Sequence, residues 1–347
     1  MSPPSALEEA RPARLWWGSV LLGSASVLVV AGLGVLVGAA DLPVNAVLAA
    51  LVDWLPGIDV DNGLTDLQLG ILFEIRLPRV VLGALVGCVL ASAGAAYQGV
   101  FRNPLADPYL LGIAAGAGLG ATIAFASSSG RVLVPILAFL GGMLAVGVTY
   151  VLGRSVGGRS VTSLILAGVA VAAFATAVQT YLLQREDDTL REVYAWILGR
   201  LTTAGWSEVV RLLPYALVTT AVLIGARRLL DVLSIGDDEA AALGVDVGRV
   251  RAVVVVAATL GTAAAVAVSG LIGFVGIIVP HTIRLVFGWS YRVIIPLSIL
   301  FGASFLMLAD IIARTAVSPG ELPIGVVTAF LGAPFFLLVL RTMRGPT

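Results

Sequence analysis

Charged residues are scarce in this chain, and lysine is absent. Of its 347 residues, 12% are charged and 59% are hydrophobic, and the mean hydropathy is +1.03. Soluble domains carry about 25% charged residues, so the composition excludes that class and indicates a membrane protein of many spans. All 21 basic residues are arginine. The chain therefore lacks the lysine of a GxxxxGK[ST] phosphate-binding loop and cannot bind ATP by that route.

The chain has one cysteine, one histidine and no net charge. A single cysteine, Cys88, excludes an intrachain disulfide, and its apolar surroundings favour a packing role. The one histidine, His281, makes a poor metal site and favours packing or contact with a partner. A net charge of zero gives no electrostatic case for binding nucleic acid. We expect no metal site, no bound cofactor and no nucleic-acid partner in this chain.

Apolar runs of the length that crosses a bilayer, about 20 residues, recur along the chain. Alternating strand patterns are not evident, and backbone hydrogen bonds must close internally in hydrocarbon, so the runs predict helices. The expected fold is an all-α polytopic bundle over residues 15–344, after a polar tail at residues 1–14. The ten predicted spans are Leu15–Gly38, Val80–Gly99, Leu105–Ala126, Val132–Leu152, Val161–Leu183, Val209–Ala226, Val250–Ser269, Leu271–Gly288, Val293–Ala313 and Leu322–Leu340.

Arginine is distributed unevenly between the two sides that ten spans define. Eight of the 21 arginines lie on the side opposite the termini. Because cytoplasmic loops carry the excess of basic residues, both termini are expected in the cytoplasm. The side of the termini holds thirteen arginines: Arg11, Arg14, Arg102, Arg154, Arg159, Arg227, Arg228, Arg249, Arg251, Arg284, Arg292, Arg341 and Arg344.

Small residues cluster inside the predicted spans. The chain has 40 glycines, and they gather with alanine and serine, as at Ala91–Ala96 and Gly112–Gly120. Small residues let helix backbones approach closely, which favours a compact bundle or a partner interface. Ordinary tight packing and a pore lining both stay open for any one glycine.

The stretch Leu229–Arg251 is a charged, glycine-punctuated insert between two apolar runs, on the side of the termini. Acidic residues 237–239 suit the first turn of a short helix, because they oppose the positive end of the helix dipole, and Gly244 suits its C-terminal end. Asp246 is placed to cap the next long helix. Two interpretations stay open: a solvated turn, or a small helix that docks a soluble partner.

Two arginines flank a proline in the motif RLPR, residues 76–79, on the outer side. Pro78 suits a first helical turn. Arg76 and Arg79 would then face the wrong end of the helix dipole, and arginine on this side runs against the positive-inside bias. Three interpretations stay open: contact with phospholipid headgroups, pairing with Glu74, or forks for carboxylates of an external protein.

Another arginine, Arg314, lies at the outer end of the ninth predicted span and can join this pair. Asp310, one turn earlier, is expected to pair with Arg314 rather than to relay protons. Deep, unpaired ionisable residues are not evident in the predicted spans. This argues against a proton- or sodium-coupled secondary transporter.

Two turns stand out on the side of the termini, and one segment stands out on the outer side. Residues 101–108 carry two prolines and predict a rigid turn, and residues 157–163 predict a second tight turn. On the outer side, a short helix is expected at Leu190–Leu198. Three nearby aromatic residues fit an interfacial aromatic belt: Tyr194, Trp196 and Trp206.

Several motifs together make this chain similar to a known family. They cover nearly the whole chain after residue 70 and resemble the permease subunits of ABC importers for iron-siderophores, haem and vitamin B12, the FecCD-type permeases. The motifs, in order, are RLPR (76–79), QGVFRNPLADPYLLG (98–112), LAGVA (166–170), LGV (243–245), GLIGFVGIIVPHTIRL (270–285), ADIIAR (309–314) and ELPIGVVTAFLGAPFF (321–336).

The resemblance implies a type II ABC importer in the cytoplasmic (inner) membrane of a bacterium or archaeon. Such a permease is a homodimer of ten-helix subunits, joined to two cytoplasmic ATPases that hold the ATP and Mg, and to an external substrate-binding protein. By resemblance, Arg76, Arg79 and Arg314 dock the binding protein. The coupling loop, residues 229–249, would contact the ATPase through Ser234, Gly236, Asp237, Glu239, Ala240, Leu243, Gly244 and Val245. The inner gate would be formed by Asn103, Leu105, Val161 and Thr162.

The shared motifs do not separate one cargo from another. Family frequency favours a ferric siderophore, with cobalamin and haem as alternatives. Two other classes also remain open. A stand-alone secondary transporter or channel would work without an ATPase, and a membrane anchor or sensor would give no uptake into vesicles.

Overall fold

The computed structural model describes residues 15–343 except 39, 55, 128–131, 158–160, 186–189, 203–204 and 318–319, and over these residues it contains helices and no strand. The predicted tail, residues 1–14, lies outside the described residues.

Short helices are α2 (Val44–Asp53), α3 (Asp66–Gly70), the π-helix η1 (Ile71–Arg76), the 3-10 helix η2 (Pro108–Leu111), α8 (Leu190–Ile197) and α10 (Asp237–Ala242). Longer helices are α1 (Trp17–Leu36), α4 (Leu77–Phe101), α5 (Ile113–Ala126), α6 (Leu133–Gly157), α7 (Val161–Leu183), α9 (Trp206–Ile235), α11 (Val247–Ser269), α12 (Val275–Phe287), α13 (Tyr291–Thr315) and α14 (Ile324–Met343).

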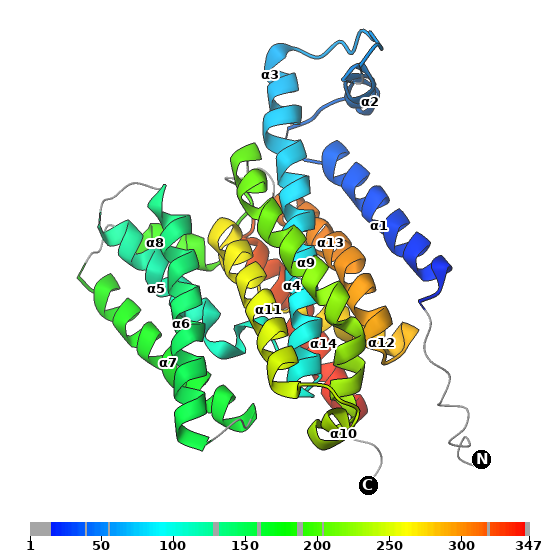
Figure 1. The fold of residues 1–347 in the computed structure, drawn as a ribbon. Helices are drawn as coiled ribbons and strands as arrows, with labels where there is room; N and C mark the ends of the chain where they lie inside the picture. The colour runs from blue at the N-terminus through cyan, green and yellow to red at the C-terminus, as the bar shows by residue number, and fades with distance from the viewer. Residues whose placement is uncertain are drawn as a thin grey trace.

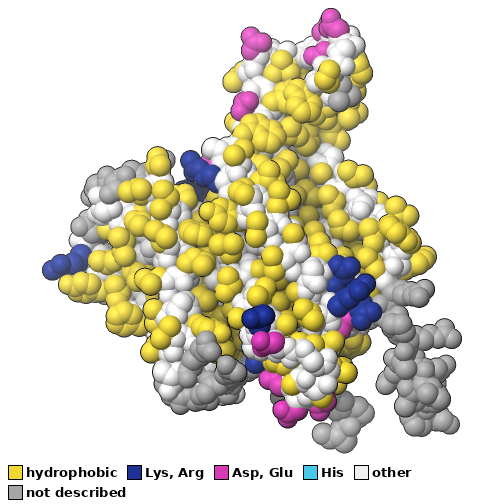
Figure 2. All heavy atoms as spheres, viewed as in Figure 1, with side chains coloured by type: hydrophobic (Ala, Val, Ile, Leu, Met, Phe, Trp, Pro, Cys, Tyr) yellow, Lys and Arg dark blue, Asp and Glu magenta, His cyan; other side chains and the backbone are white. Residues whose placement is uncertain are grey.

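Each of the ten predicted spans coincides with one of these longer helices, so the all-α polytopic fold class is confirmed. Seven helices in the described chain are long and apolar enough to cross a membrane alone, and α5, α12 and α14 are shorter apolar helices. The two shortest of these helices, α5 and α12, begin after the predicted starts of their spans. Gly112 (φ 85°) ends η2 before α5, and residues 270–274 are non-helical before α12. In Figure 2, acidic side chains gather over α2 and α3 at the top and around α10 at the bottom, with a broad hydrophobic belt between them.

Helix α4 is the central element of the bundle. Every residue from Val89 to Phe101 is buried, and α9, α11, α12 and α13 all pack against this helix. Figure 1 shows α9 crossing in front of α4 and α11 beside it, while α5, α6, α7 and α8 form a second group at the left. The second group packs against the first mainly through α6 and α11.

Glycines permit the closest approaches of α4 to its neighbours. A Cβ atom added at Gly87 would lie 2.2 Å from the carbonyl oxygen of Gly302 in α13. One added at Gly94 would lie 2.1 Å from the carbonyl oxygen of Gly276 in α12. These positions therefore pack backbone against backbone, and at these sites the tight-packing interpretation of the small residues is confirmed.

Two sequence-based expectations at the outer side are wrong. The helix that carries the RLPR motif does not begin there, because a continuous helical stretch runs from Asp66 through η1 into α4. Pro78 has no N–H to donate to the carbonyl of Glu74, and the π-helix directly before it accommodates this missing bond. Trp196 does not belong to an exposed aromatic belt, since it is 5% exposed and packs in the core, whereas Tyr194 is 54% exposed.

We expect Gly94→Ala to destabilise the protein, because the new Cβ would overlap the Gly276 backbone, which cannot move aside cheaply. The loss should be about 1–3 kcal/mol or more, as for an overpacked core, and would appear as a lower thermal midpoint of the detergent-solubilised chain. Gly225→Ala in α9 is the matched control, because nothing lies within 4 Å of a Cβ added there. Equal midpoints for the two variants would contradict the close contact of α4 with α12.

Candidate functional site

Arg76 is buried at the end of α1, with 4% of its surface exposed. Its Nη1 donates to the carbonyls of Val35 (3.2 Å) and Leu36 (3.3 Å), and its Nη2 donates to the carbonyl of Ala40. The last carbonyls of a helix lack intrahelical partners and carry the negative end of its dipole. Arg76 therefore stabilises the C-terminus of α1. The sequence-based expectation that it opposes the dipole of its own helix is wrong.

Arg79 is held between two carboxylates and is 7% exposed. Its Nε and Nη2 donate to Asp310 in α13, the shortest distance being 2.8 Å. Its Nη1 and Nη2 donate to the two carboxylate oxygens of Glu321, at 2.9 and 3.0 Å. Glu321 lies in the connection between α13 and α14. Every nitrogen of the Arg79 guanidinium thus donates to an acidic side chain of this chain.

Arg314 completes this cluster of side chains and is 3% exposed. Its Nε lies 3.3 Å from Asp310 at spacing i,i+4, so the predicted pair is confirmed, and its Nη2 donates to the carbonyl of Gly34 at 2.8 Å. We call Arg76, Arg79, Asp310, Arg314 and Glu321 the arginine cluster.

The structure brings the three predicted docking arginines together but engages each of them internally. The predicted alternative of pairing with Glu74 is not seen: this side chain is exposed and forms none of the described bonds of Arg76 or Arg79. Because buried ion pairs hold their partners in fixed geometry, the described contacts give the cluster a structural role. The docking role stays a prediction.

At the opposite end of the bundle, the insert between α9 and α11 folds as its sequence predicts. The short helix α10 carries acidic residues 237–239 in its first turn, and Gly244 (φ 82°) follows its end. The Asp246 side chain accepts the backbone N–H of Arg249 at 3.0 Å and caps α11. Gly236, at φ 155°, makes the turn from α9 into α10. Figure 1 shows α10 below the ends of α9 and α11.

Asp237 fastens α10 to two other elements. It pairs with Arg102 at 3.2 Å, and it accepts hydrogen bonds from Arg251 of α11 on both oxygens at 3.1 Å. Arg102 ends α4 in the left-handed conformation (φ 49°) and directly precedes Asn103. Neither partner of Asp237 was predicted, because the sequence around an arginine does not indicate which distant carboxylate it will meet.

The outer surface of α10 is open. Ser234 and Glu239 are exposed, and Leu243 is 66% exposed although it is apolar. Ala240 is fully buried, and Val245 packs against the core. Ala240 and Val245 anchor the helix to the core, whereas the exposed Leu243 is not among the residues packed on it.

The predicted gate residues lie in two segments. The Asn103 side chain accepts the backbone N–H of Leu105 at 2.9 Å, and both residues are half-buried. The turn that they form leads into η2, where the Tyr109 hydroxyl donates to the carbonyl of Ile272 at 3.0 Å. Thr162 is exposed at the start of α7, and the Val161 side chain lies outside the described residues. The gate assignment stays a prediction.

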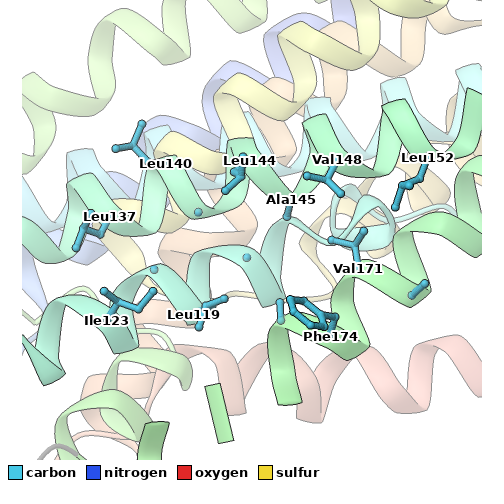
Figure 3. A pocket seen from close by; sticks show the side chains of 15 residues that line it. Leu119, Ile123, Leu137, Leu140, Leu144, Ala145, Val148, Leu152, Val171 and Phe174 are labelled. Carbon is cyan, nitrogen blue, oxygen red and sulfur yellow. The ribbon is translucent and has the colours of Figure 1, made fainter. Parts of the chain in front are cut away.

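A groove within the second helix group contains no polar side chain. It encloses about 520 Å³ between α5, α6 and α7, and Figure 3 shows Leu119, Leu144 and Phe174 among the carbon-only side chains that line it. Such a surface cannot orient a charged chelate, since specific sites need a few placed polar groups. Among the described residues, no group of three His, Cys, Asp or Glu side chains could hold a metal ion.

The arginine cluster and α10 lie at the two ends of α4. Arg79 and Arg102 are separated by 23 residues of this helix, which is about 35 Å at roughly 1.5 Å per residue. The hydrocarbon core of a bilayer is about 30 Å thick. One buried helix thus connects two charged sites that are far enough apart to lie on opposite sides of a bilayer.

We expect Asp310→Ala to destabilise the protein strongly, because Arg79 and Arg314 share this buried carboxylate and would face each other without it. Breaking a buried ion pair costs about 3–5 kcal/mol, measurable by thermal unfolding in detergent. Arg211→Ala is the control, since the Arg211 side chain is 51% exposed and its pair with Glu208 is long, at 3.6 Å. The control should lose no more than about 1 kcal/mol of unfolding free energy. A similarly small loss of stability in Asp310→Ala would refute the assigned role of this carboxylate.

Several known proteins are similar to this chain in sequence. The chain is 40% identical to an uncharacterized ABC transporter permease, YvrB of Bacillus subtilis, over 95% of both chains. It is 44% identical to the cobalamin import permease BtuC of Halobacterium salinarum, over 77% of this chain and 72% of that protein. It is 41% identical to the hemin transport permease HmuU of Yersinia pestis, over 80% of this chain and 85% of that one.

A solved structure shares the fold along almost the entire chain. It shows the inward-facing conformation of an ABC transporter proposed to be of the metal-chelate type, with a TM-score of 0.82 and 26% sequence identity, over 94% of this chain and 100% of the other. The sequence pattern described as the FecCD transport family matches residues 21–342. This chain is therefore a multi-pass membrane permease and belongs to the FecCD transport family.

Proposed function

We propose that this chain is the permease of an ABC importer that carries a ferric siderophore across the cytoplasmic membrane. The placement of two charged sites at opposite ends of α4 carries the proposal. The arginine cluster suits an acidic external protein, and α10 suits a soluble partner on the other side. The chain lacks the lysine of a phosphate-binding loop, so a partner ATPase with its own ATP and Mg supplies the energy.

The arginine count supports the orientation of the proposed importer. With both termini and α10 in the cytoplasm, thirteen of 21 arginines lie on the cytoplasmic side, in line with the positive-inside bias. The arginine cluster then lies at the outer end of α4, on the side where a substrate-binding protein would dock.

The contacts of Asp237 support a route for coupling. When the ATPase moves α10, the pair with Arg102 passes that movement to the end of α4 and to the adjoining turn at Asn103, which we propose as part of the inner gate. We assign Leu243 as the main contact with the ATPase, because at 66% it is slightly more exposed than Ile235, the other large exposed apolar side chain beside α10, at 62%. Two copies of the chain would enclose the path between them.

The cargo is best tested by comparing the uptake of different chelates. The relatives named above carry names of cobalamin and hemin transport, and a further one, FhuB of Bacillus subtilis, is named for iron(3+)-hydroxamate import at 34% identity. The described grooves are mainly apolar, so we assign cargo recognition to the external binding protein. Cobalamin is the second candidate, because the chain is 44% identical to a cobalamin import permease.

Uptake into vesicles tests this proposal. The chain, its ATPase and the binding protein encoded near it would be reconstituted, and a ferric hydroxamate, cyanocobalamin and haemin would be supplied separately. We expect ATP-dependent uptake of the ferric hydroxamate and none with a non-hydrolysable ATP analogue. ATP-dependent uptake of another chelate would change the cargo, whereas uptake driven by a proton gradient without ATPase would overturn the importer proposal.

We expect Leu243→Asp to uncouple ATP hydrolysis from transport, because a charge replaces the exposed apolar contact while the core anchors Ala240 and Val245 remain. Hydrolysis by the reconstituted complex should lose its stimulation by loaded binding protein, and uptake should fall at least several-fold. Leu243→Met keeps the apolar surface and serves as the control. Normal coupled uptake by Leu243→Asp would show that α10 does not couple through this side chain.

A further inference from the structure

The two carboxylates on Arg79 differ in how firmly they are fixed. Asp310 is 3% exposed, sits inside α13 and also pairs with Arg314. Glu321 is 28% exposed and pairs with Arg79 alone among the described contacts. Exposed ion pairs are screened and weak compared with buried ones. Glu321 is therefore the partner that Arg79 releases more easily.

Glu321 also has the geometry that an external carboxylate would adopt. It binds the Arg79 fork in a bidentate manner through Nη1 and Nη2, which is the standard recognition of a carboxylate by arginine. The remaining edge of the guanidinium faces the buried Asp310. An acidic partner cannot bind Arg79 face to face while Glu321 occupies this edge.

We infer that Glu321 is an internal stand-in for an acidic side chain of the external binding protein. It fills the outer edge of the Arg79 fork in the free permease, and the partner's carboxylate displaces it on docking. This inference rests on the proposed docking role of the arginine cluster. It explains how an arginine that is 7% exposed, and bound internally on both edges, can still take part in recognition.

Displacement of Glu321 would act on α14, which begins three residues later at Ile324. The connecting segment is held by the N–H of Leu322, which donates to the carbonyl of Ala313 at 2.8 Å. The first turn of α14 is held by N–H groups of Ile324 and Gly325, which donate to the carbonyls of Gly199 (3.2 Å) and Leu198 (3.1 Å) beyond α8. Release of Glu321 from Arg79 removes a further restraint on this segment, so docking would loosen the start of α14.

Removing the charge of Glu321 tests the inference, because the inference predicts that the affinity for the binding protein rises rather than falls. The permease–ATPase complex would be placed in phosphatidylcholine nanodiscs, and its affinity for the substrate-binding protein would be measured by biolayer interferometry at low and moderate salt. We expect Glu321→Gln to bind several-fold more tightly, because the internal competitor is lost. Glu321→Asp keeps a carboxylate and should bind close to the unaltered chain.

Two further variants separate this inference from the docking proposal. Asp59→Asn removes an exposed acidic charge outside the arginine cluster and controls for net charge, so it should leave the affinity unchanged. Arg79→Gln should weaken binding, and Glu321→Gln should have no effect in that background. Unchanged or weaker binding by Glu321→Gln, with Arg79→Gln impaired, would overturn the stand-in role alone. Unchanged binding by Arg79→Gln would instead overturn the proposed docking role.

Hydrogen exchange provides a measurement that does not depend on the variants. In the unaltered complex, amide exchange at Leu322, Ile324 and Gly325 should accelerate when the binding protein docks. Slower or unchanged exchange at these amides would show that Glu321 stays in place, and this would refute the displacement.

Discussion

The buried pairing of Arg79 with Asp310 is the interaction on which the outer half of this structure depends. Two guanidiniums share this carboxylate, and one of them also reaches the backbone of α1. Charges in an apolar interior are tolerated only when they are paired and hydrogen-bonded. The requirement joins α1, α4 and α13, elements from the beginning and the end of the chain, because none of these charges can be buried until its partners are in place.

Small residues then let α4 serve as the common axis of the bundle. Backbone contacts at Gly87 and Gly94 bring α13 and α12 against it with no side chain between them. Close-packed backbones leave little space for side-chain rearrangement, so we expect α4 to move with its neighbours as one body. A displacement at its α10 end would then be passed on by geometry and would need no chain of side-chain movements.

The two ends of α4 differ in how tightly their charges are held. The Arg79–Asp310 pair is almost fully buried, whereas the side chains of Arg102 and Asp237 are 40% and 42% exposed. Exposed pairs are weak and exchange with water, while buried pairs are costly to separate. This difference suits a fixed frame at one end and an adjustable connection at the other. Under the inferred displacement, Glu321, whose side chain is 28% exposed, is the adjustable member of the otherwise fixed cluster.

The sequence by itself determined the ten helices, the short helix α10 with its Gly244 end and Asp246 cap, and the pairing of Asp310 with Arg314. Each follows from hydropathy, dipole and spacing along the chain, which are local quantities. Only the tertiary structure decided that Arg76 and Arg79 point inward, that Trp196 is buried, and that Arg102 meets Asp237. Those outcomes depend on which groups, distant in sequence, supply the carboxylates and carbonyls, because an arginine must satisfy its charge wherever folding places its partners.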